Sequence, residues 1–238
     1  MALSLQRLFV KRMLQDILRY KLTYTLIALN LIVYLFSSFY SHSFVDMEIE
    51  TLVEMGALFG PYTVQQGEWW RLATAMFLHG GMTHILMNMF SLYLIGRGAE
   101  MYFDTKSYIS IYLFSGLIGG LASLYMHPGS VGVGASGAIF GVFGALAGFF
   151  LAHKEEIAVQ SKAFMKDFAI IIGINLVIGF SIPAVDVSAH LGGLVIGFLG
   201  GFLLSKSRHF LLLYNSAMVL VIAAFILYLP SQYAQTTF

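Results

Sequence analysis

The sequence predicts an all-α membrane protein, a polytopic bundle of seven transmembrane helices. Of its 238 residues, 58% are hydrophobic and only 11% are charged, and the mean hydropathy is +0.81. A soluble domain needs a polar surface and carries about 25% charged residues, so the bilayer is the solvent that fits this chain. Seven apolar segments approach or reach the roughly 20 residues that a membrane-spanning helix needs. They are residues 22–40, 72–95, 108–126, 136–152, 168–182, 187–204 and 210–229.

The distribution of basic residues orients the chain. With the N-terminus placed in the cytoplasm, all of the 13 Lys and Arg residues except Arg71 fall on the inner side. Because inner loops carry an excess of Lys and Arg, we expect a multi-pass protein of the cell membrane, with a cytoplasmic N-terminus and an extracytoplasmic C-terminus. Residues 1–21 form the cytoplasmic segment, which is either an amphipathic helix along the inner surface or a charged tail before the first span.

Charge and composition exclude several classes of function. A net charge of +1 is too small for nucleic-acid binding through bulk charge. The chain has no cysteine, which excludes disulfides, thiolate metal sites and thiol nucleophiles. The predicted spans contain neither the paired aspartates of an aspartyl protease nor the His-Glu-x-x-His pattern of a zinc protease.

Histidines are the ionisable groups that stand out in the predicted spans. His84 and Asn88 lie four residues apart on one face of the second span, and His79 lies near its outer edge. His190 lies about one turn inside the sixth span. A single membrane histidine can be structural and hydrogen-bonded, but two at similar depth near the outer face favour a functional site.

The sequence Gly134-Ala135-Ser136-Gly137 opens the fourth span, and alone it is also typical of close helix packing. Glycines follow both Ser136 and His190 at helical spacing. They are Gly137, Gly141, Gly144 and Gly148 after the serine, and Gly193, Gly197 and Gly201 after the histidine. Such stripes let two helix backbones approach closely, so we expect the outer starts of these helices to meet and Ser136 to neighbour His190.

The length of the fourth span predicts that Ser136 lies below the outer surface. Residues 136–152 rise only about 24 Å, whereas the hydrocarbon core is about 30 Å thick. The preceding residues 128–135 must therefore dip inward, which is tolerated only beside protein or a water-filled cavity. A serine at a submerged helix N-terminus has free N–H groups around it, and these can form an oxyanion hole.

Together these pieces resemble the rhomboid family of intramembrane serine proteases. The matching motifs run from about Trp70 to Gly201. They are Trp70-Arg71, His79…His84-x-x-x-Asn88, Gly134-Ala135-Ser136-Gly137 and Ala189-His190-x-x-Gly193-x-x-x-Gly197. The resemblance implies a rhomboid-like fold, with a six-helix catalytic core in residues 22–205 and a seventh helix and short outer tail in residues 206–238.

The resemblance also implies an activity, that of a serine endopeptidase cleaving transmembrane segments of membrane proteins near the outer face. Ser136 and His190 would form a catalytic dyad that needs no cofactor and no metal. The oxyanion would be stabilised by His84, Asn88 and the backbone N–H of Ser136. The partners would be transmembrane substrates and the lipid bilayer.

Supporting roles follow from the same resemblance. Trp70 and Arg71 would brace the outer loop, and His79 would organise a water pocket or act directly. Phe140 stands where many members have a Tyr that packs on the catalytic imidazole, and it should keep that ring contact. Residues 181–186 would form a cap over the site, with Asp186 part of the cap and not of a triad.

Three other functions are alternatives to proteolysis. A non-catalytic relative of the same fold should lack the serine or the histidine, and both are present. A small-solute transporter or channel should show two related halves, and the sequence shows no internal repeat. The third is a haem or metal protein that uses His79, His84 and His190. It leaves the presence of Ser136, Asn88 and the glycine stripes as coincidence.

Overall fold

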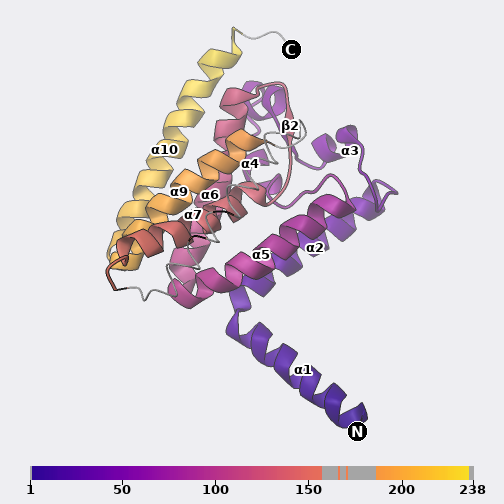
Figure 1. Cartoon of the computed structure of the whole chain (residues 1–238). Helices are drawn as coiled ribbons and strands as arrows, with labels where there is room; N and C mark the ends of the chain where they lie inside the picture. The colour runs from indigo at the N-terminus through magenta and orange to yellow at the C-terminus, as the bar shows by residue number, and fades with distance from the viewer. Residues whose placement is uncertain (1, 157–165, 167–169, 171–185, 236–238) are drawn as a thin grey trace.

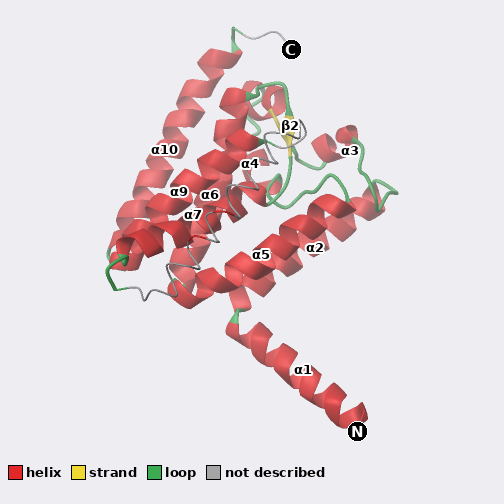
Figure 2. Ribbon diagram, in the orientation of Figure 1, coloured by secondary structure: helices red, strands yellow, loops and turns green. Residues whose placement is uncertain are grey.

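The computed structural model describes residues 2–156, 166, 170 and 186–235. This part of the chain is almost entirely helical (Figure 2). Its helices are α1 (Ala2–Arg19), α2 (Lys21–Tyr40), α3 (Ile49–Glu54), α4 (Arg71–Thr74), α5 (Met82–Tyr102), α6 (Thr105–Met126), α7 (Ser136–Ala152), α9 (Val187–Lys206) and α10 (Phe210–Tyr233), with a π-helical turn η1 (Pro61–Gln65). Two short strands, β1 (Leu58–Phe59) and β2 (Val131–Gly132), pair antiparallel. The all-α prediction is confirmed.

Among the described residues, four helices are long and apolar enough to cross a membrane: α2, α6, α9 and α10. Helix α7 is apolar but has only 17 residues, as the sequence predicts. The predicted fifth span, residues 168–182, lies outside the described residues except for position 170. The count of seven spans therefore stays a prediction.

The predicted second span, residues 72–95, is wrong at both ends. Helix α4 stops at Thr74, and α5 begins only at Met82 and continues to Tyr102. Gly81 sets the start of α5: its extended backbone forms a bridge with Asp46, and a Cβ there would collide with the Val45 carbonyl. His79 consequently lies in the loop before α5 and not in a membrane-spanning helix.

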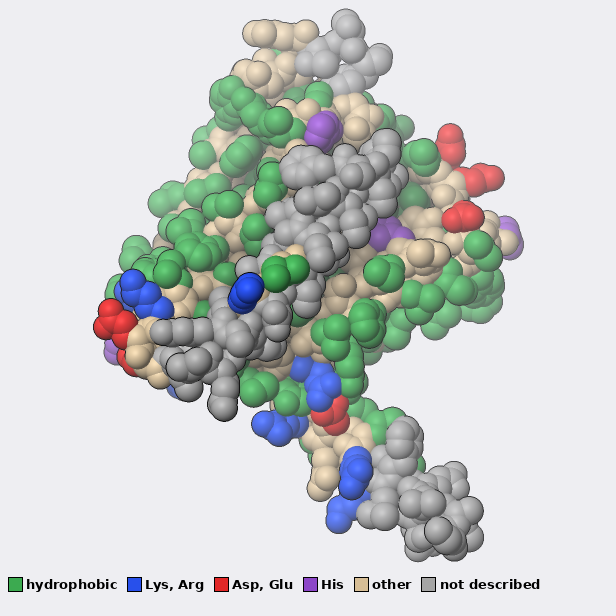
Figure 3. Space-filling model, in the orientation of Figure 1, with side chains coloured by type: hydrophobic (Ala, Val, Ile, Leu, Met, Phe, Trp, Pro, Cys, Tyr) green, Lys and Arg blue, Asp and Glu red, His purple; other side chains and the backbone are tan. Residues whose placement is uncertain are grey.

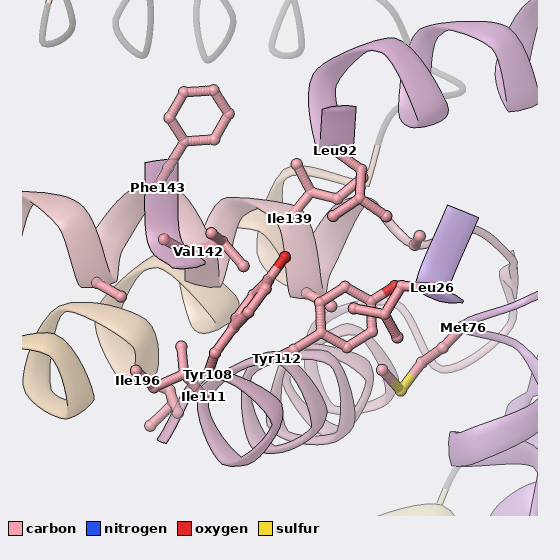
Figure 4. Packing of buried hydrophobic residues seen from close by; sticks show 14 of the residues in the cluster. Leu26, Met76, Leu92, Tyr108, Ile111, Tyr112, Ile139, Val142, Phe143 and Ile196 are labelled. Atoms are coloured by element: carbon pink, nitrogen blue, oxygen red, sulfur yellow. The ribbon is translucent and has the colours of Figure 1, made fainter. Parts of the chain in front are cut away.

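The core is built around α6, α7 and α9, with α2 and α5 packed side by side against it (Figure 1). Tyr108 and Tyr112 of α6 point into the space between α7, α5 and α2, among Val142, Leu92 and Leu26 (Figure 4). Helix α10 runs along the outside of the bundle, and α1 projects away from it (Figure 1). Arg97 of α5 holds the end of α1 by donating to Asp16, with 2.8 Å between Nη2 and Oδ1.

Helices α7 and α9 touch backbone to backbone along the two glycine stripes. A Cβ on Gly193 or Gly197 would collide with the carbonyl oxygen of Gly137 or Gly141 respectively. One turn further, Gly201 faces the Ala145 backbone in the same way. The predicted docking of the two stripes is confirmed, and it sets the relative position of the two helix starts.

Candidate active site

Ser136 is the first residue of α7, and a short loop held on two sides leads to it. Strand β2 in this loop pairs with β1, and the Gly134 N–H donates to the Ala75 carbonyl at 2.9 Å. Gly134 has a φ of +118°, a left-handed conformation that favours glycine. The motif glycine is therefore needed to turn the chain into α7 so that Ser136 begins the helix.

His190 reaches Ser136 across the α7–α9 contact. Its Nε2 lies 2.8 Å from Ser136 Oγ, a hydrogen-bond distance between residues 54 positions apart in the sequence. The imidazole is only 8% exposed, and it projects from the first turn of α9. A nucleophile within hydrogen-bond reach of a base is the geometry that activates a serine hydroxyl.

Phe140 stacks on the His190 imidazole, and Asp186 caps the helix that carries it. The Phe140 ring stacks on His190, with centroids 4.3 Å apart and planes inclined by 13°, so the predicted ring contact is confirmed. Asp186 accepts from the Ser188 and Ala189 backbone N–H groups and so caps α9. Within the described chain, His190 Nδ1 is buried without a hydrogen-bond partner. The ring is thus held by stacking, and among the described residues its hydrogen-bond partner is Ser136 and not a carboxylate.

His84 lies beside the loop that leads to Ser136. Its Nε2 and Cε1 are so close to Gly134 that a Cβ on this glycine would stand 2.8 and 2.9 Å from them. The buried His79 ring packs edge-on against His84 at 5.0 Å between centroids. Asn88, one turn along α5 and also buried, donates from Nδ2 to the His84 carbonyl at 2.9 Å. An amide nitrogen carries two hydrogens, so this bond leaves one of them for a ligand.

Arg71 ties the outer loops to α4. Its buried guanidinium donates to the Val53 carbonyl at 2.6 Å, to the Ala57 carbonyl at 3.1 Å and to Glu68 Oε2 at 2.6 Å. The guanidinium carbon also lies 4.8 Å from the centre of the ring of Trp70, a residue that is about half exposed. Arg71 therefore fixes the segment whose next residues include Ala75, the acceptor for Gly134.

Two groups that help to hold this region could not be recognised from the sequence. The Ala75 carbonyl that holds Gly134 is a backbone group, which no residue type encodes. His127, at the end of α6, lies with Nε2 3.2 Å from Ser188 Oγ and so links α6 to the first turn of α9. Of the predicted cap, residues 181–185 lie outside the described residues. In the described part of the chain, no group of three or more His, Cys, Asp or Glu residues could hold a metal ion.

A family model for the rhomboid domain matches residues 66–207, which is more than half of the chain. The chain belongs to the rhomboid family. With this membership and its apolar helices, it is a multi-pass membrane protein.

Several rhomboid relatives align with most of the chain. RHOMBOID-like protein 6, mitochondrial, of Arabidopsis thaliana is 41% identical over 161 residues, 68% of this chain and 52% of that protein. Rhomboid protease GluP of Bacillus subtilis (strain 168) is 36% identical over 176 residues, 74% of this chain and 33% of GluP. The chain thus spans about half the length of the first relative and a third of the second. Putative rhomboid protease YdcA of the same bacterium is 34% identical over 185 residues, 77% of this chain and 88% of YdcA.

Proposed function

We propose that this rhomboid is an intramembrane serine endopeptidase, which cleaves transmembrane segments of membrane proteins by a Ser136–His190 dyad near the outer face. The observation that carries the proposal is the 2.8 Å approach of His190 Nε2 to Ser136 Oγ at the partly buried start of α7. Two of the aligned relatives are named as rhomboid proteases, one of them as putative, which supports the same activity.

The dyad geometry suits a two-step acyl transfer. Ser136 Oγ attacks the carbonyl carbon of the scissile peptide while His190 Nε2 takes the hydroxyl proton. The resulting imidazolium gives this proton to the leaving nitrogen, the C–N bond breaks and an acyl ester forms on Ser136. Water then attacks the ester with His190 as the base, which releases the new carboxyl end and restores the hydroxyl.

Three donors are available for the oxyanion of the tetrahedral intermediate: the Ser136 backbone N–H, the Asn88 amide and the His84 ring. The N–H of Ser136 is one of the four at the start of α7 that have no acceptor within the helix. His84 lies against Gly134, two residues before the nucleophile. These positions support their shared role without assigning all the stabilisation to one donor.

Replacing Asn88 or His84 by Ala should each lower kcat by about 10- to 1000-fold, because the loss of one oxyanion donor raises the free energy of the transition state by up to about 4 kcal/mol. The variants should remain folded and should still bind substrate with a similar KM. Cleavage kinetics on a purified transmembrane substrate measure both parameters. Full activity in either variant, beside an inactive Ser136→Ala protein, would remove that residue from the oxyanion site.

The orientation proposed for the chain places its N-terminus in the cytoplasm of a cell and its C-terminus outside the cell membrane. In this arrangement residues 1–21 are cytoplasmic, residues 22–205 form the catalytic core and residues 206–238 add a helix and an outer tail. The Lys and Arg side chains in view gather towards the end of the bundle from which α1 projects (Figure 3). This supports the orientation, since basic residues favour the inner side.

A submerged serine predicts which transmembrane segments are cleaved. A stable helix hides its carbonyls in i to i−4 hydrogen bonds, so the cut needs a segment that unwinds easily. We expect single-span substrates with a small residue at the cut and Gly, Pro or polar residues just below it. Replacing that Gly or Pro by Leu should slow cleavage markedly.

The test uses one single-span substrate with different tags at its two ends, reconstituted with the wild-type protein and with Ser136→Ala. Mass spectrometry of the tagged fragments locates the cut relative to the outer face. A cut near the outer face that requires Ser136 supports the proposal. A cut at the inner face would overturn the orientation, and an unchanged rate for the Leu substrate would overturn the unwinding argument.

A further inference from the structure

The last helix, α10, is attached to the bundle by an apolar stripe with a tyrosine at each end. Large side chains such as Leu220 and Leu227 are 70% and 81% exposed and form its outer face. On the inner face, Tyr214 donates to the Ile196 carbonyl of α9 at 3.4 Å. At the other end, Tyr233 donates to the Leu124 carbonyl of α6 at 2.7 Å, and its side chain is buried.

The Tyr233 hydroxyl donates to the Leu124 carbonyl, which has no hydrogen-bond donor within α6. In an α-helix the Leu124 carbonyl would accept from the residue four positions later, which is Pro128 and has no N–H. An unpaired backbone carbonyl in an apolar setting is costly, so a hydroxyl from α10 at this point stabilises the end of α6. The Tyr233 contact therefore depends on the proline with which the next loop begins.

That loop is the one that ends at Ser136. Gly60, in the turn before η1, lies between its first residue and α10: a Cβ on Gly60 would collide with both the Pro128 carbonyl and the Tyr233 ring. Gln65 of η1 also donates to the Tyr233 carbonyl at 3.4 Å. The loop is thus held at its start by α10 and near its end by the Gly134–Ala75 hydrogen bond.

A separate cluster of buried side chains joins these two holding points. It contains residues from β1, η1, α4, α6 and α10, together with Ala75. Its members are Leu58, Val64, Leu72, Ala75, Leu121, Leu124, Leu229 and Tyr233. Ala75 belongs to this cluster, and its carbonyl accepts from the Gly134 N–H. Because the side chains between them are closely packed, a displacement of Tyr233 should also displace Ala75.

We propose that Tyr233 is a positioning residue, through which α10 holds residues 128–135 in the conformation that presents Ser136 and its backbone N–H to the scissile carbonyl. The inference rests on the proposed function of Ser136. In this proposal α10, the seventh helix of the predicted topology, contributes to catalysis through the residues at its outer end.

Two variants that each remove one hydroxyl test this role. Tyr233→Phe deletes the outer anchor and Tyr214→Phe deletes the inner one, while both rings keep their packing. The readouts are kcat and KM on a transmembrane substrate and the rate at which a fluorophosphonate labels Ser136, which does not require a substrate helix to bind. Both variants are assayed in detergent at a temperature well below that at which the less stable one unfolds. A lower rate then does not result from a smaller amount of folded protein.

Tyr233→Phe should lower kcat and the labelling rate together by about tenfold with KM unchanged, because small displacements of a reacting group are costly. Tyr214→Phe should leave all three near their wild-type values. Equal effects of the two variants, or a wild-type labelling rate in Tyr233→Phe, would overturn the inference. Failure of the proposed function is seen separately, as absence of labelling at Ser136 in the wild-type protein.

Discussion

Replacing Ser136 by Ala should abolish both fluorophosphonate labelling and cleavage of a model transmembrane substrate. A serine hydroxyl is a weak nucleophile at its ordinary pKa and reacts only beside a base, and Ser136 is the serine that lies 2.8 Å from the His190 Nε2. His190→Ala should lower the rate by at least about 1000-fold, because members of such a pair act as a unit. Mass spectrometry of the labelled protein should find the adduct at Ser136 and at no other serine.

Ser188→Ala is the matched control for this experiment. Ser188 lies in the first turn of α9, two residues before His190, but its hydroxyl contacts His127 instead of the catalytic imidazole. The variant should therefore be labelled and cleave close to the wild-type rate. A chelator should leave cleavage unchanged. Proteolysis by Ser136→Ala, or loss of activity with the chelator, would contradict the serine mechanism and favour the metal alternative.

Helix α7 shows how far sequence reasoning reaches in this fold. The predicted bounds, residues 136–152, are those of the structure, because a Gly-Ala-Ser-Gly start and a His-Lys end enclose an unbroken apolar run. The pairing of Ser136 with His190 was also predictable, since glycines at helical spacing specify which faces of two helices meet. Both inferences depend on patterns within a single helix, the apolar run and the glycine spacing, and the folded chain keeps these helices.

The break between α4 and α5 could not be predicted in this way. Residues 72–95 are mostly apolar, so their mean hydropathy favours one continuous helix. Directly before α5, the backbone instead pairs with a distant segment: Met47 N–H donates to the Gly80 carbonyl at 3.0 Å and Met82 N–H to the Val45 carbonyl at 2.8 Å. These bonds join backbone groups, so the sequence marks them only by Gly81, which the close approach to the Val45 carbonyl requires.

The end of α10 differs from its prediction for a similar reason. The predicted span ends at residue 229, directly before Pro230, and a proline disfavours the helix interior. The helix instead continues to Tyr233, whose hydroxyl and carbonyl are both held by other parts of the chain. Tertiary hydrogen bonds therefore offset a local preference, and the extra turn is the one that carries the proposed positioning residue.

Adding a single methyl group at Gly197 should impair both folding and catalysis. A Cβ at this position would collide with the Gly141 carbonyl oxygen, which belongs to the backbone of α7 and cannot rotate away. The two helices must then separate, which costs about 1–3 kcal/mol or more by overpacking. Because Ser136 and His190 lie on these two helices, the 2.8 Å contact should lengthen, and a shift of about 1 Å can cost about 100-fold in rate.

Gly98→Ala is the control that separates this collision from the general effect of the substitution. Gly98 lies within α5, and a Cβ there would meet only the Leu146 Cδ1 at 3.5 Å, an ordinary contact. Both changes replace a helical glycine by alanine, which by itself favours the helix by about 0.5–1 kcal/mol. Gly98→Ala should therefore unfold in detergent at or above the wild-type temperature and keep its labelling rate. Gly197→Ala should unfold at a lower temperature and label Ser136 slowly even where it is fully folded. If the two variants behaved alike, close backbone contact between α7 and α9 would not be what brings the dyad together.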